Sequence, residues 1–86
     1  MTPALTIADF EPFLGHLFAS AQGELRLETA SRAGEAPAPL PAPFTLEFSG
    51  PPGLAQGIHD LTHPTLGTLG IFLVPLAPTR YEAVFG

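Results

Sequence analysis

The sequence predicts a mostly all-β fold: a small antiparallel β-barrel or sandwich of five to six short strands with one short N-terminal helix. Two observations support this prediction. Segments of alternating polar and apolar residues recur about every ten residues, and clusters of proline and glycine separate them. With 86 residues the chain has room for one domain, so we expect residues 1–86 to form a single small β domain.

The helix is expected at residues 7–14. Phe10 and Phe13 repeat at helical spacing and form one apolar stripe. Pro12 is tolerated only in the first turn of a helix, and Gly15 is a natural stop, so the helix must be short. Because such a short helix is not stable alone in water, its aromatic face is expected to pack against the strands.

The strands follow from alternation and from the turn residues between them. The pattern is strictest at residues 44–49, where Phe44, Leu46 and Phe48 are expected to face inward. Gly67 is expected to take a positive φ in the turn before the next strand. In order, the expected strands cover residues 16–22, 24–30, 44–49, 54–62, 68–76 and 80–85.

The strand at residues 68–76 differs from the others because it has no polar face. The run from Ile71 to Val74 is continuously apolar, which is typical of a strand that is covered on both faces. We therefore expect the N-terminal helix, or a partner chain, to cover the outside of this strand.

Residues 31–43 form the longest segment without an expected helix or strand. Prolines stand at every second position from Pro37 to Pro43, which forbids a helix and removes backbone donors from a sheet. We expect an extended, Pro-rich surface loop. Because the prolines are not spaced as in P-x-x-P motifs, a stiff connector is favoured over a ligand for a proline-reading domain.

Composition argues against several classes of function. The chain has no cysteine, which excludes disulfides, zinc–thiolate sites, iron–sulfur clusters and cysteine nucleophiles. Three basic residues against eight acidic ones give a net charge of −5, which argues against nucleic-acid binding. No apolar run is long enough for a membrane span, and no basic, apolar signal opens the chain. The default expectation is a cytoplasmic location, with export as part of an assembly left open.

Charged residues are sparse. They make up 13% of the chain, against about 25% in an average soluble domain. One interpretation is a neutral surface of serine, threonine, proline, glycine and alanine. The other is that part of the surface is covered, which predicts self-association or a stable protein partner.

Three histidines and an aspartate have the one spacing that suggests a metal site. His59, Asp60 and His63 lie close together in the sequence. In a strand, four residues span about 13 Å, so the two histidines can share a metal only if the chain bends sharply or if His16 arrives from elsewhere. This hypothesis makes the chain a small-molecule or metal-binding protein that uses His16, His59 and His63. In the competing interpretation, His63 caps the turn before Pro64 and His59 is half-buried and hydrogen-bonded.

No arrangement of residues indicates catalysis, so we expect the chain not to be an enzyme and to use no cofactor. A serine could be combined with His59 and Asp60, but no nucleophile motif supports such a triad. The serines considered are Ser20, Ser31 and Ser49. Short strands around seven phenylalanines should fill the interior with side chains and leave no ligand cavity.

The chain also carries a set of short motifs that together resemble a known family. They are Phe44 to Phe48, Gln56 to Ile58, Leu61 to Gly67, Phe72 to Pro75 and Tyr81 to Phe85. The pattern resembles a family of small bacterial proteins known as a domain of unknown function, whose members end in the same Tyr-Glu-Ala-Val-Phe signature. The resemblance implies no catalytic residue and a neighbourhood of phage-tail-collar-type, microcystin-dependent-type proteins.

Together, these features favour a non-enzymatic structural or protein-interaction module. Such a module would work as an oligomer or as an accessory of a larger, phage-tail-like assembly. If residues 80–85 form an exposed edge strand, Tyr81, Glu82 and Val84 are the candidate contact residues for strand addition.

Overall fold

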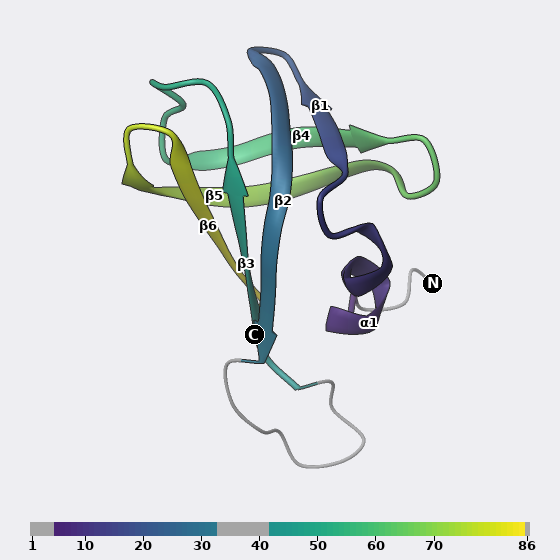
Figure 1. The fold of residues 1–86 in the computed structure, drawn as a ribbon. Helices are drawn as coiled ribbons and strands as arrows, with labels where there is room; N and C mark the ends of the chain where they lie inside the picture. The colour runs from purple at the N-terminus through teal and green to yellow at the C-terminus, as the bar shows by residue number, and fades with distance from the viewer. Residues whose placement is uncertain (1–4, 33–41, 86) are drawn as a thin grey trace.

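The computed structural model describes residues 5–32 and 42–85 and shows a closed antiparallel β-barrel with a short helical segment at one end (Figure 1). The strand order around the barrel is β1-β2-β3-β6-β5-β4. The elements are α1 (Ile7–Phe10), a 3-10 turn η1 (Glu11–Phe13), β1 (Leu17–Ser20), β2 (Gly23–Arg32), β3 (Phe44–Ser49), β4 (Gly57–His63), β5 (Gly67–Ala77) and β6 (Arg80–Phe85). The predicted fold class is therefore confirmed.

The inward faces of the strands form the core. On β3 the predicted alternation is confirmed, because Phe44, Leu46 and Phe48 are buried and the residues between them are not. The other buried apolar residues are Ile7, Phe10, Phe18, Leu25, Leu27, Leu54, Leu61, Ile71, Leu73, Tyr81 and Ala83. No pocket is found within the described part of the chain.

A β-bulge adjusts the phase of β2. Leu27 pairs with Phe48, but Thr29 and not Glu28 pairs with the next residue of β3, Glu47. The extra residue moves the inward positions from odd to even numbers, so that Ala30 pairs with Leu46 on the core side. This shift lets a ten-residue strand keep its apolar residues inside.

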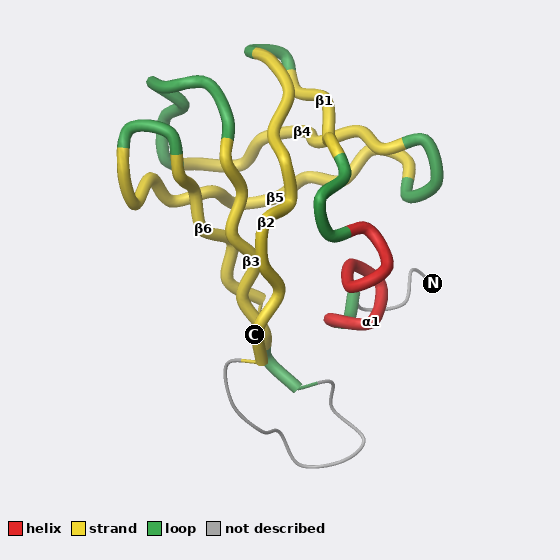
Figure 2. Tube along the Cα trace, viewed as in Figure 1, coloured by secondary structure: helices red, strands yellow, loops and turns green. Residues whose placement is uncertain are grey.

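The helical segment covers the end of the barrel that contains Phe85, the last residue that the structure describes (Figure 2). Asp9 accepts a hydrogen bond from the backbone N–H of Thr6 at 2.8 Å, which fixes the start of α1. The buried Phe10 ring lies 5.9 Å from that of Phe44 and 5.7 Å from that of Phe85. The prediction that an aromatic helix face packs against the strands is confirmed.

The expectation that this helix covers the outside of the apolar strand is wrong. Ile71 and Leu73 of β5 face the core, whereas the alternate residue Phe72 is 49% exposed. The helical segment lies instead beside β2, which extends beyond the end of the shorter strand β1. The N–H of Gly15 donates to the carbonyl of Leu27 at 2.7 Å, so the chain before β1 continues the pairing with β2.

Residues 80–85 do not meet the condition of an exposed edge strand, on which the candidate contact residues depended. β6 pairs with β3 along its whole length on one side and with β5 at Arg80, Tyr81 and Glu82 on the other, so it lies between two strands of the described barrel. Tyr81 is 1% exposed and belongs to the core. Glu82 is half-buried and Val84 is exposed, as expected of outward-facing positions in a barrel strand.

Several predicted boundaries move. The first strand is shorter than residues 16–22, and the strand predicted at 54–62 starts only at Gly57 and ends at His63. Residues 31 and 32 belong to β2 and not to the Pro-rich loop, and residues 33–41 of that loop lie outside the described part. Gly67 has the expected positive φ, at 75°. No helix among the described residues is long and apolar enough to span a membrane.

Candidate functional site

The structure brings two of the four predicted metal-site residues together. His16 precedes β1 and His63 ends β4, and Nδ1 of His16 lies 3.1 Å from Nε2 of His63. His63 is 4% exposed, and the rings of Phe13 and Phe18 lie 4.6 and 5.0 Å from its ring. His16 is exposed. The pair therefore lies at the surface of the barrel with one buried and one accessible imidazole.

The hydrogen bonds of His63 fix its tautomer. Its Nδ1 accepts the backbone N–H of Thr65 at 3.0 Å and that of Leu66 at 3.4 Å. An imidazole nitrogen that accepts hydrogen bonds carries no proton, so the proton of neutral His63 is on Nε2. That N–H then donates to Nδ1 of His16. The prediction that His63 caps the turn before Pro64 is confirmed.

This tautomer does not suit metal binding by the pair. To bind a metal through Nε2, neutral His63 would need its proton on Nδ1, where it would face the N–H groups of Thr65 and Leu66. The short contact to His16 is thus a hydrogen bond. Within residues 5–32 and 42–85 no group of three His, Asp or Glu side chains is placed to hold a metal ion.

The other two residues of the predicted site point elsewhere. His59 is half-buried on the inward face of β4, and its Nε2 donates to the carbonyl of Ala55 at 2.7 Å. This confirms the competing interpretation of His59. Asp60 is exposed on the outward face of the same strand. His59 shares the inward face with His63 but bonds to Ala55, and Asp60 lies on the outward face, so the structure does not gather these two residues around His63.

The candidate serines have partners other than histidine. Ser20 donates to the carbonyl of Gly23 at 2.6 Å, and Ser49 donates to the carboxylate of Glu28. Ser31 pairs with Thr45 in the β2–β3 ladder. No serine–histidine hydrogen bond occurs in the described residues, so the geometry does not assemble a triad there.

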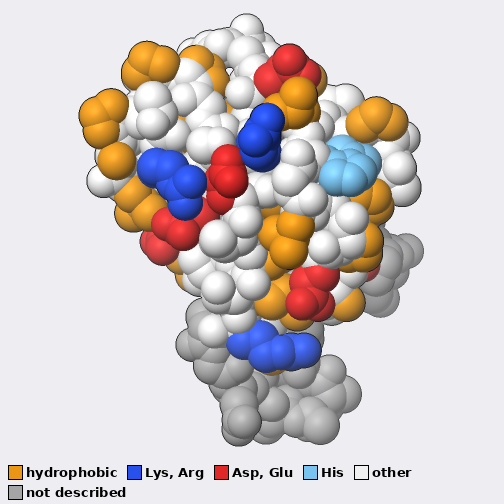
Figure 3. Space-filling model, viewed as in Figure 1, with side chains coloured by type: hydrophobic (Ala, Val, Ile, Leu, Met, Phe, Trp, Pro, Cys, Tyr) orange, Lys and Arg blue, Asp and Glu red, His pale blue; other side chains and the backbone are white. Residues whose placement is uncertain are grey.

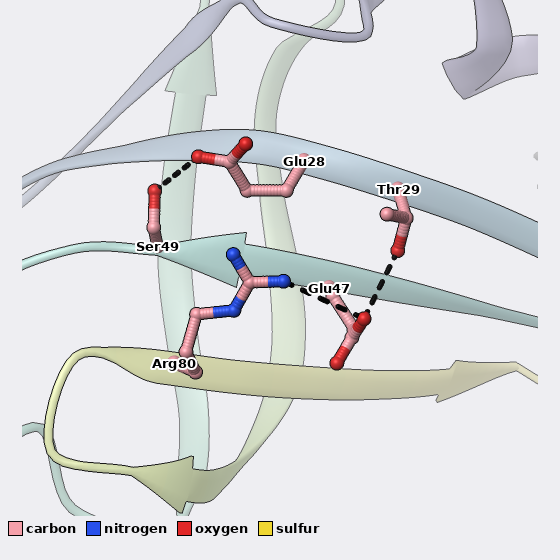
Figure 4. Close-up of polar contacts among 5 residues, drawn as sticks. All are labelled: Glu28, Thr29, Glu47, Ser49 and Arg80. Atoms are coloured by element: carbon pink, nitrogen blue, oxygen red, sulfur yellow. Dashed lines mark hydrogen bonds and ion pairs between the residues drawn. The ribbon is translucent and has the colours of Figure 1, made fainter.

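The outer face of β2, β3 and β6 is a polar surface (Figure 4). Glu47 accepts a hydrogen bond from Thr29 at 3.3 Å and lies 3.6 Å from the guanidinium of Arg80. Basic and acidic side chains are interspersed over this view of the molecule (Figure 3). An exposed ion pair of this kind contributes about 0–1 kcal/mol. These contacts are typical of a solvated sheet face.

The face of β4 and β5 has a different character. Ile58 is 73% exposed and pairs directly with Phe72, which is 49% exposed. Val74 lies two residues further along the same face of β5, next to Glu82 of β6, and Val84 lies two residues beyond Glu82. We name Ile58, Phe72, Val74 and Val84 the outer apolar patch.

The margin of the outer apolar patch is acidic. Asp60 follows Ile58 on the outward face of β4, and Glu82 separates Val74 from Val84. Residues 57–77 contain no lysine or arginine. Arg80 of β6 lies at Glu47 on the side of β3. The patch is therefore apolar at its centre and negative at its edge.

Sequence reasoning did not identify this surface. The apolar run in β5 predicts a strand covered on both faces, and Ile58 belongs to a sequence motif with no assigned role. The alternation in β4 does indicate this surface, because His59 and Leu61 face inward and Ile58, one residue before His59, must then face outward.

The comparison with protein families gives one result. A family model described as Domain of unknown function (DUF6916) matches residues 5–85. The chain belongs to this family. Searches of curated proteins and of solved structures give no match. The family description assigns no activity to DUF6916 members, so the features above are the basis for a functional proposal.

Proposed function

We propose that this DUF6916 chain is a non-enzymatic protein-interaction module that docks a protein partner on its outer apolar patch. The module serves as an accessory of a larger assembly. The observation that supports the proposal is the cross-strand pair of Ile58 and Phe72, two large apolar side chains exposed side by side on a closed barrel. Contiguous apolar surface of this kind is a mark of protein contact sites.

Docking through side chains suits a closed barrel. β4, β5 and β6 each have a strand neighbour on both sides within the described structure, so they offer less free edge for an added strand than an open sheet does, although β4 meets β1 only through the pair of Thr62 and Ala19. The cross-strand pair presents instead a flat surface that buries apolar area on contact. Removing such area from water contributes about 25 cal/mol per Å² before the costs of association.

The acidic margin specifies the chemistry of the partner. Asp60 and Glu82 flank the outer apolar patch, and the whole chain has a net charge of −5. A second copy that docked face to face would bring these carboxylates together, which is unfavourable. The fitting occupant is a segment of another protein with aliphatic or aromatic side chains at its centre and lysine or arginine at its ends.

Calorimetric binding of two short peptides tests this proposal. One peptide has a Leu-Val-Leu centre with two lysines at each end, and the other has glutamates in place of the lysines. We expect the basic peptide to bind and the acidic peptide not to bind. The double substitution of Ile58→Ser and Phe72→Ser should weaken binding by at least about tenfold, because it removes the apolar centre.

A matched control separates the patch from apolar exposure in general. Leu17 is 46% exposed but lies on β1, away from the patch, so Leu17→Ser should leave binding unchanged. Equal binding of both peptides, or equal weakening by Leu17→Ser, would contradict the proposal. A dimer in a sedimentation concentration series that is lost with Phe72→Ser would identify a second copy as the occupant and overturn the basic-partner assignment.

A further inference from the structure

The pairing between β5 and β6 covers only one part of β5. The described ladder joins Val74, Pro75 and Ala77 of β5 to β6 and includes no residue before Val74. Beyond Glu82, β6 pairs with β3 alone, and Figure 1 shows β5 and β6 diverging from the turn that joins them. Residues 67–73 of β5 therefore pair with β4 on one side and with no described strand on the other. We name residues 67–73 the β5 edge.

The β5 edge carries backbone groups that no described strand pairs. In an antiparallel strand, alternate residues direct their N–H and C=O groups to opposite sides, so about half of these groups point away from β4. Thr68, Gly70 and Phe72 are exposed, so this stretch of β5 is open to solvent. A strand edge with free backbone groups is a template for pairing with another chain.

The β5 edge lacks the usual protection of an edge strand. Natural edges are blunted by charged side chains, by proline or by bulges. Residues 67–73 contain no charged residue and no proline. The pairing of these residues with β4 also runs without a register shift from Gly57 to His63. The β5 edge is therefore suited to accept a further strand.

Gly70 lies in the middle of the β5 edge, and the barrel itself does not require a glycine there. Its φ is not positive, and an added Cβ atom would make ordinary contacts, the nearest with Ile58 at 3.4 Å. A glycine inside a strand without a bulge often marks a place that another backbone approaches closely. The missing side chain also leaves a path to Asp60, whose carboxylate oxygen lies 3.8 Å from the position of that Cβ atom.

We propose that the β5 edge is a strand-addition site for an extended basic segment of a partner protein. This inference rests on the proposed function and specifies how the partner binds, namely as a further strand beside β5. One apolar side chain of the segment lies beside Phe72. The residue two positions away, a lysine or arginine opposite Gly70, reaches across the glycine to the Asp60 carboxylate.

A second copy of this chain fits the β5 edge less well. The β5 edge contains no basic residue that could lie opposite Gly70 of another copy. Each copy also has a net charge of −5, and like charges oppose association. A segment with lysine or arginine beside its apolar residues complements both features.

Two N-methylated forms of the basic peptide test the backbone pairing. The N–H groups of consecutive residues in a strand point to opposite edges, so only one of two neighbours can face β5. One form carries the methyl group on the nitrogen of the first leucine of the Leu-Val-Leu centre, and the other carries it on the nitrogen of the valine. We expect one form to bind at least about tenfold more weakly than the unmodified peptide and the other to bind as the unmodified peptide does.

Amide hydrogen exchange followed by NMR gives a second readout that needs no variant. When the unmodified peptide is bound, alternate amides from Gly67 to Leu73 should gain about tenfold protection, because they become paired. The amides between them already face β4 and should change less. Amides of the β3–β6 ladder serve as the internal control.

A matched pair of substitutions tests the role of Gly70. Gly70→Val places a branched side chain between the partner and Asp60 and should weaken binding about two- to fivefold, the effect of losing one exposed ion pair. Thr68→Val introduces the same side chain two residues earlier on the same face and should leave binding unchanged. Equal effects of the two substitutions would overturn the placement of the basic residue.

The outcomes separate this inference from the proposed function. Equal affinities of the two N-methylated forms would overturn strand addition, even if the unmodified peptide still bound through Ile58 and Phe72. No binding of the unmodified peptide would overturn the proposed function and this inference with it. A dimer without peptide, in which the alternate amides of the β5 edge are already protected, would identify a second copy as the occupant and overturn the assignment of a basic partner.

Discussion

Tyr81 joins the core of the barrel to the chain between β3 and β4. Its ring is buried, and its hydroxyl donates to the carbonyl of Pro51 at 2.6 Å and accepts the N–H of Leu54 at 3.2 Å. A buried tyrosine hydroxyl with two backbone partners is a structural anchor. Tyr81 therefore serves the fold, although the sequence pattern alone makes it a candidate contact residue at an edge.

Removing only this hydroxyl measures its contribution. Tyr81→Phe leaves the N–H of Leu54 and the carbonyl of Pro51 without their partner, and we expect a loss of about 1–3 kcal/mol in the free energy of unfolding, measured with urea. The exposed substitution Val84→Thr on the same strand serves as the control and should change stability by less than about 0.5 kcal/mol. Equal effects of the two substitutions would show that the hydroxyl is not an anchor.

For the strands, the alternation of polar and apolar residues predicts the features that depend on local sequence alone, namely where a strand lies and which face is buried. β3 is predicted with the correct ends and faces and β6 with the correct ends, because a strand with one buried face alternates with period two. Alternation does not predict the faces of β5, because a continuous apolar run does not distinguish a strand buried on both faces from one that exposes apolar side chains. Nor did it predict the bulge at Glu28, which depends on the pairing of β2 with β3.

The helical segment is the element whose contribution can be separated most clearly. Phe10 of α1 and Phe44 of β3 are both buried, and their rings are 5.9 Å apart. Phe10→Ala and Phe44→Ala should each lower the free energy of unfolding by about 3–5 kcal/mol. Because the rings touch, the double variant should lose less than the sum, by about 0.5–3 kcal/mol.

Urea unfolding of the two single variants and the double variant gives this coupling. Strict additivity would show that α1 does not close the barrel end through this contact. A loss under about 1 kcal/mol for Phe44→Ala would contradict its place in the core. Where a variant is unfolded without denaturant, the same cycle can be measured with leucine in place of alanine.

The whole molecule combines a filled barrel with two unlike outer faces. The β2–β3–β6 face carries hydrogen-bonded and paired charges, whereas the β4–β5 face carries the outer apolar patch with its acidic margin. Neither the contrast between the two faces nor the His16–His63 contact follows from residue spacing, since both depend on which strands become neighbours. His16 and His63 are 47 residues apart in sequence.

A map of where the basic peptide binds tests the docking surface on β4 and β5 most directly. In an NMR titration of the isotope-labelled chain with the lysine-flanked Leu-Val-Leu peptide, we expect chemical-shift changes at Ile58, Phe72, Val74 and Val84. Resonances of Thr29 and Glu47 on the polar face should stay in place. Shifts centred on the polar face, or no shifts at the patch when the peptide is in excess, would contradict the assignment of the β4–β5 face as the docking surface.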